Sequence, residues 1–134
     1  MTEPSLALQM AIRARLVASP HVMELVEPPN IRDGGTRPEA FPSIILGSAQ
    51  VETAGHYRTY RNVTVYLDLH IWGETLEATK NVGAAVSKAL FGEPDVPGFD
   101  LTNGLSVERS IYMTDPSACG HGVVSLRALM GGAI

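Results

Sequence analysis

The stretch that decides the fold is Val63-Thr64-Val65-Tyr66-Leu67-Asp68-Leu69-His70-Ile71-Trp72. Apolar residues at the odd positions alternate strictly with polar or aromatic residues at the even positions. This period of two is typical of a β-strand that buries one face in a core. The even-numbered face is more than a solvated surface, since Tyr66, His70 and Trp72 are large and partly apolar. We therefore expect that face to pack against something, such as another subunit.

Two long helices are predicted on either side of this strand. Residues 3–18 and 75–91 carry apolar residues at helical spacing. Ser19-Pro20 ends the first helix, and Gly92 fits the left-handed residue that caps the second. A short helical turn is expected at residues 21–26.

Three further strands are predicted, at residues 43–48, 105–113 and 123–130. In the second of them Leu105, Val107, Ile111 and Met113 form an apolar face that Arg109 interrupts. Residues 30–42 are rich in breakers and predict a surface loop, residues 52–62 a long hairpin tip, and Gly131-Gly132 a frayed end. Hairpin pairs separated by a helix favour an α+β fold, mainly an antiparallel sheet of about four strands with two main helices on one face.

Length and composition exclude several classes of protein. The 134 residues predict a single domain, residues 1–134, and 45% hydrophobic against 18% charged residues predict a folded chain. A net charge of −4 argues against a large basic surface for nucleic acid. No run of about 18 apolar residues is present, so no membrane span is expected. The acidic start and the single Cys119 favour the cytoplasm.

Candidate catalytic and metal-binding residues are few. Cys119 and His121 allow a thiol nucleophile with a histidine base, but nothing in the spacing orients the imidazole. Asp68 and His70 share a strand face and form a possible acid/base pair, although a subunit contact or a hydrogen-bond network is the simpler interpretation. The histidines are scattered, and no phosphate-binding glycine loop is present. The sequence therefore predicts no catalytic residue, no metal and no cofactor.

Four stretches together resemble one protein family. They are the opening helix Leu8-Gln9-Met10-Ala11-Ile12-Arg13-Ala14-Arg15-Leu16, the strand entry Phe41-Pro42-Ser43-Ile44-Ile45-Leu46-Gly47, the strand Leu67-Asp68-Leu69-His70-Ile71-Trp72, and the closing Gly120-His121-Gly122-Val123-Val124-Ser125-Leu126-Arg127-Ala128-Leu129. They resemble, in order and over nearly the whole chain, the tail-terminator or tail-completion proteins of long-tailed phages, prophages and gene transfer agents.

The resemblance implies a structural virion protein and not an enzyme. Such a protein forms a ring, usually a hexamer, on the end of a tail tube, stops its polymerisation and offers a joining surface to the head connector. The implied partners are other copies of the chain, the major tail tube protein and the head-side connector or stopper. The free subunit is expected to be a monomer, DNA to pass through the lumen without specific binding, and assembly to take place in the bacterial cytoplasm.

Carried onto this sequence, the resemblance makes residues 51–62 the element that faces the tube or the lumen. Arg58, Tyr60 and Arg61 are its expected contacts. The face formed by Tyr66, Asp68, His70 and Trp72 is expected to pack between ring subunits. Two alternatives stay open: another head–tail joining protein such as a stopper or connector, and a small hydrolase built on Cys119 and His121.

Overall fold

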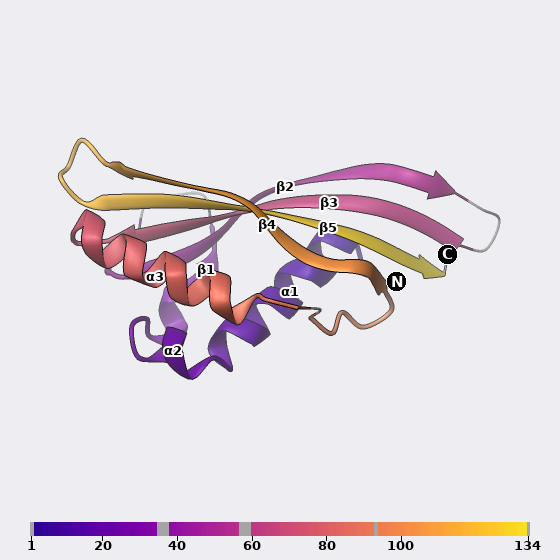
Figure 1. Cartoon of the computed structure of the whole chain (residues 1–134), viewed down its shortest axis with the longest axis horizontal. Helices are drawn as coiled ribbons and strands as arrows, with labels where there is room; N and C mark the ends of the chain where they lie inside the picture. Colours follow the sequence, from indigo (N-terminus) through magenta and orange to yellow (C-terminus); the bar gives the residue numbers. More distant parts are fainter. Residues whose placement is uncertain (1, 35–37, 57–59, 93, 134) are drawn as a thin grey trace.

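A computed structural model of the chain describes residues 2–34, 38–56, 60–92 and 94–133. The helices are α1 (Pro4–Val17), α2 (Pro20–Met23), the 3-10 turn η1 (Pro28–Asn30) and α3 (Leu76–Ala89). The strands are β1 (Ile31–Asp33), β2 (Ser43–His56), β3 (Tyr60–Gly73), β4 (Asp100–Thr114) and β5 (Gly120–Ala133). The four long strands twist across the molecule with all helices on one side (Figure 1).

The strands form one sheet in the order β1-β2-β3-β5-β4. Its four long strands are antiparallel neighbours, and β1 pairs with β2 in parallel. The predicted α+β fold with an antiparallel sheet is confirmed, with five strands in place of about four. The extra strand was predicted as loop; Ile31 is fully buried beside Ile44, and this single apolar anchor holds a three-residue strand.

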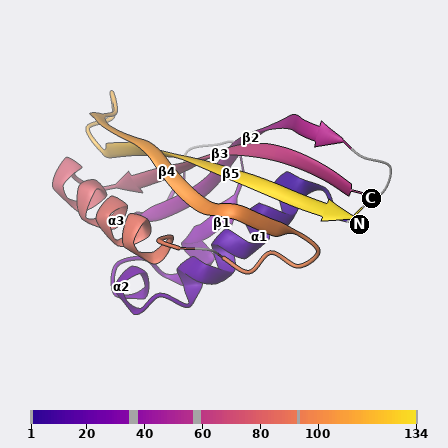
Figure 2. The ribbon, with the colours of Figure 1, turned by 45° about the vertical axis from the view of Figure 1, so that its right-hand side comes forward.

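The core lies between the sheet and the helices. The odd-numbered residues of β3 all point into it, as the alternation predicted: Val63, Val65, Leu67, Leu69 and Ile71 are at most 3% exposed. Leu8, Ile12 and Leu16 of α1 and Val82 and Val86 of α3 cover them. Figure 2 shows both long helices beneath the same face. Among the described helices, none is long and apolar enough to cross a membrane.

Both long helices begin at a side chain that caps their free amide groups. The Glu3 carboxylate accepts a hydrogen bond from the Ser5 amide at 2.7 Å, and the Thr75 hydroxyl accepts one from the Ala78 amide at 3.1 Å. After α3 the chain turns at Gly92, whose φ of 100° lies in the left-handed region that favours glycine. The predicted helix ends are therefore confirmed within one or two residues.

Two segments that were predicted as irregular are strands. Residues 52–56 and 60–62, predicted as part of a hairpin tip, continue the β2–β3 ladder as far as the pair His56 and Arg61. Gly131 and Gly132, predicted to fray, are buried and pair with Asn62 and Arg61. Long-range pairing with β3 holds these polar and glycine-rich ends extended, which local composition does not reveal.

The prediction for β4 was wrong about its faces. A β-bulge between Val107 and Arg109 shifts the register against β5. Leu105 and Val107 therefore lie on the helix side, whereas Arg109, Ile111 and Met113 lie on the other side. One extra residue in a strand reverses the direction of every side chain after it. Arg109 accordingly does not interrupt an apolar face; it begins a different one.

Candidate functional site

The face of the sheet that is turned away from the helices carries the predicted contact residues. We call it the outer face; on β3 it consists of Thr64, Tyr66, Asp68, His70 and Trp72. Cross-strand pairing arranges it in rows. One row contains Arg109, Ser125 and Asp68, and the next contains Ser106, Arg127, Tyr66 and Gln50. The strand ladder thus brings residues from four distant parts of the chain into one surface.

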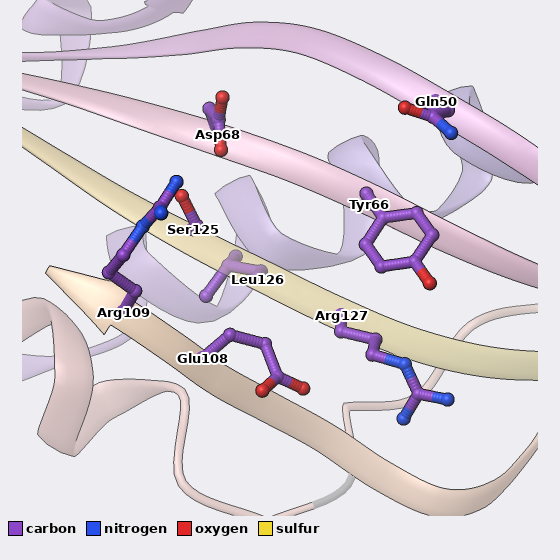
Figure 3. A pocket seen from close by; sticks show the side chains of 8 residues that line it. All are labelled: Gln50, Tyr66, Asp68, Glu108, Arg109, Ser125, Leu126 and Arg127. Carbon is purple, nitrogen blue, oxygen red and sulfur yellow. The ribbon is translucent and has the colours of Figure 1, made fainter.

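The centre of the outer face is a polar hollow of about 700 Å³. It is lined by Gln50, Tyr66, Asp68, Glu108, Arg109, Ser125, Leu126 and Arg127. Figure 3 shows the Arg109 side chain reaching from β4 toward Ser125 of β5, with Asp68 on the strand beyond. Two acidic and two basic groups share this surface, so its charge is mixed and nearly balanced. Such a surface provides polar contacts without strong attraction for a polyanion.

The end of the outer face next to the β4–β5 turn is built differently. The His121 ring stacks on the Trp72 ring with centroids 3.9 Å apart and planes inclined by 6°. His70 Nδ1 and His121 Nε2 are 3.0 Å apart, a hydrogen bond in which one imidazole donates and the other accepts. Trp72 also packs with Ile45 and Cys119, and is only 9% exposed. Ile45, Trp72 and Cys119 thus form a small second core, on which the His121 ring is stacked.

Burial lowers the pKa of His121 from its ordinary value, and the nearby His70 lowers it further, while Asp115 acts in the opposite direction. The folded protein therefore favours the neutral imidazole more than the unfolded chain does. The unfolded chain takes up the proton first as the pH falls, so acidification favours unfolding. The stability that this group contributes is complete above its ordinary pKa of 6.5.

We expect the free energy of unfolding to decrease as the pH is lowered from about 7 to 5. In His121→Phe the free energy of unfolding should decrease less over the same pH range. Phenylalanine keeps a ring for Trp72 to stack on but has no titrating group. Chemical denaturation at several pH values measures the effect. Phe91→Ala, at an exposed residue that has no titrating group, is the control and should keep the wild-type slope. An identical slope in His121→Phe would contradict the assignment.

The residues predicted to face the tube or the lumen are only partly described. Arg58 lies outside the described residues. Tyr60 begins β3, and Arg61 is half-buried and pairs with Gly132 of β5 and His56 of β2. Arg61 also lines a hollow beside the start of α1, together with Val51 and Thr53. The β2–β3 end of the sheet thus lies close to the amino-terminal end of the first helix.

The Cys119–His121 pair is not arranged as a nucleophile and its base. The Cys119 thiol is buried and lies 3.4 Å from the Ser117 hydroxyl, whereas the His121 ring is engaged by Trp72 and His70. Within the described residues, no three histidine, cysteine or acidic side chains are grouped so that they could hold a metal ion. Asp68 lies in the polar hollow, and His70 is bonded to His121 at the other end of the face.

The sequence interpretation missed half of the outer face. Glu108, Arg109 and Arg127 line the polar hollow, and His121 completes the aromatic cluster. The alternation of His121, Val123, Ser125 and Arg127 along the last strand was the available signal for β5. For β4 no such signal existed, because the bulge decides which side chains point outward.

The sequence matches a known protein family. The family described as tail completion protein gp17 matches residues 10–131 of the chain. The chain belongs to this family. The predicted family is confirmed by this match. Tail completion proteins are a structural class and not a class of enzymes.

Among the solved structures that share the fold of this tail completion protein are the following two. A chain in the virion of a native gene transfer agent particle superposes with a TM-score of 0.80 at 22% identity, covering 93% of this chain and 95% of that one. The gp17 protein of bacteriophage SPP1 superposes with a TM-score of 0.57 at 20% identity, covering 93% and 89%. A search of curated proteins gives no significant match.

Proposed function

We propose that this tail completion protein forms a ring on the end of a phage-like tail tube, stops tube polymerisation and offers the joining surface for the head connector. The observation that carries the proposal is the family match over residues 10–131. The match to a chain of a gene transfer agent virion, with a TM-score of 0.80, supports a place in such a particle. Ring size and the partner on each side follow from the family resemblance and are part of the proposal.

The arrangement of the outer face supports a role in contact and not in catalysis. Tyr66 and Asp68 line the open polar hollow and do not belong to the hydrophobic core, so their side chains can contact other parts of the particle. His70 and Trp72 are packed against His121, so we propose that they support this surface from within the sheet. Arg58, Tyr60 and Arg61 remain the proposed contacts at the β2–β3 end.

A lumen that passes DNA must not bind it tightly. The mixed charges of Asp68, Glu108, Arg109 and Arg127 fit that requirement, since a cluster of cations alone would release counterions and hold the phosphates. The net charge of −4 acts in the same direction. We therefore propose that the outer face is a surface along which DNA slides, in place of the predicted packing of this face between ring subunits.

The test is a polymerisation assay with the major tail tube protein of the same particle. We expect addition of this protein at less than one copy per ten tube subunits to shorten the tubes, because each ring blocks one growing end. Negative-stain electron microscopy should show one capped end per tube. Unchanged tube lengths at equimolar addition would refute the capping role.

The alternative function, a stopper or connector on the head side, predicts a different defect in particles made without the protein. Loss of a terminator gives overlong or headless tails, whereas loss of a stopper gives filled heads that leak DNA. The hydrolase alternative predicts that Cys119→Ser abolishes an activity; under the structural proposal this variant still caps tubes.

A further inference from the structure

Both edges of the sheet have an open stretch of regular strand. On β2, β1 pairs only with residues 44–46, so among the described residues the outer edge of β2 is uncovered from Gly47 onward. On β4, the Leu105 amide bonds to the Gly92 carbonyl at 3.4 Å, so the loop after α3 covers the beginning of the strand. Between bulges and turns, the regular open stretches are residues 49–53 of β2 and 109–114 of β4.

The open stretch of β4 begins at a bulge and a charged Arg109, but beyond them it lacks the usual protection against pairing. It contains neither proline nor lysine, and it exposes Ile111 by 43% and Met113 by 41% on the outer face. Edge strands with unpaired backbone groups and exposed apolar side chains are templates for pairing with another strand. A partner strand would satisfy the backbone groups and cover both side chains.

The directions of the strands decide which strand fits. Along β2, β3, β5 and β4 the directions alternate, so β2 and β4 run opposite to each other. If copies are related by rotation about an axis, β4 of one copy meets β2 of the next in antiparallel orientation. A repeated contact between two different surfaces is the kind that closes into a ring.

We propose that residues 109–112 of β4 pair antiparallel with residues 49–52 of β2 in a second copy of the chain, and that this contact joins the sheets into a closed barrel. The inference rests on the ring in the proposed function and assigns its subunit contact. The side chains of both outer faces must lie on one side, which restricts the register. The register that places Arg109 opposite Glu52 also joins opposite charges and places Ile111 opposite Gln50.

This register gives a strand tilt that closed barrels require. Arg109 is level with Asp68 of β3, and Glu52 is level with Thr64, so neighbouring copies are shifted by four residues along the strands. A shift of four residues, each about 3.3 Å long, over four strands spaced about 4.8 Å apart corresponds to a strand tilt of about 35° from the barrel axis. Strands in closed barrels tilt by about 35–45° from the barrel axis. The estimate uses only the shift and width of one copy, so it is the same for any number of copies.

The direction of the shift also decides which face is inside. Helix α3 connects the parallel strands β3 and β4, and such crossovers are right-handed. Figure 1 agrees, with β4 in front of β5 and β3 and the helices beneath the sheet. Because β-strands are twisted, the strands of a barrel coil around its axis in a right-handed sense. The four-residue shift between copies has this sense only when the helices lie outside the barrel. The outer face with its polar hollow would therefore line the lumen.

The first test is disulfide trapping in the full chain with Cys119→Ala to remove the native thiol. In the double variant Gln50→Cys and Ile111→Cys, oxidation at concentrations up to about 1 mM should give a ladder of linked copies that ends at the closed ring. Gln50→Cys with Phe91→Cys is the control, because Phe91 is 84% exposed just after α3 and lies outside both proposed pairing stretches. It should give no ladder.

The outcomes separate this inference from the proposed function. Dimers formed by Ile111→Cys alone would indicate pairing of β4 with itself and overturn the inference, as would a double variant that stays monomeric at every concentration. Rings that cap tubes without β2–β4 cross-links would overturn the inference and leave the function standing. Cross-linked rings that do not shorten tubes would overturn the proposed capping function and leave the β2–β4 contact standing.

A second test needs no cysteine. Arg109→Glu and Glu52→Arg should each raise the concentration required for half-assembly by about three- to tenfold, since cross-strand pairs of like charge are unfavourable. The two changes combined should restore assembly, because the opposite charges then face each other again. Both residues are exposed, so the variants should fold. Failure of the double variant to recover would contradict the register.

Discussion

Replacing Leu69 by alanine is expected to lower the free energy of unfolding by about 2–5 kcal/mol, the largest effect of any single change proposed for this protein. Leu69 is fully buried at the centre of β3, where it belongs to the core between sheet and helices. The variant loses the transfer free energy of the side chain and leaves a cavity into which the surrounding structure relaxes only partly. Urea denaturation followed by far-UV circular dichroism measures the loss.

Leu25→Ala is the matched control for this prediction. Leu25 is 41% exposed just after α2, so its truncation removes little contact with the core. The expected change is about 0.5 kcal/mol or less, as is usual for surface substitutions. Equal losses in the two variants would contradict the assignment of the β3 odd-numbered face to the core.

Replacing Trp72 by alanine is expected to cost about 3 kcal/mol of stability, although Trp72 lies on the outer face. It is 9% exposed, stacks on His121 and packs with Ile45 and Cys119. Its removal opens the second core and leaves the His70–His121 pair without its apolar support. Thermal denaturation gives the loss, and near-UV circular dichroism reports the changed environment of the remaining aromatic residues.

The effect of Trp72 distinguishes a supporting residue from a direct subunit contact. We expect Trp72→Ala to lose stability already as a free subunit, at a concentration too low for assembly. Phe91→Ala, at an aromatic residue that is 84% exposed, should leave stability nearly unchanged. A Trp72→Ala subunit that is as stable as wild type but defective in assembly would instead support the prediction that Trp72 lies between subunits.

Half of the site was predictable because alternation is a local property. The even-numbered residues of β3 were correctly placed on one face, since side-chain direction in a regular strand repeats every second residue. The partners of these residues were not predictable. Asp68 lies level with Ser125 and Arg109, and Trp72 with His121, only because β5 pairs with β3 and β4 pairs with β5 in particular registers.

The sequence by itself determined the type and order of the long elements, the core face of β3 and the ends of both helices. These follow from periodicity and capping, which involve residues a few positions apart. Only the tertiary structure decided that Ile31 anchors a fifth strand, that β4 reverses its faces at Arg109, and that His70 bonds to His121. Each of these depends on a strand pairing between distant segments, whose register is set by the packing of the whole sheet and not by local composition.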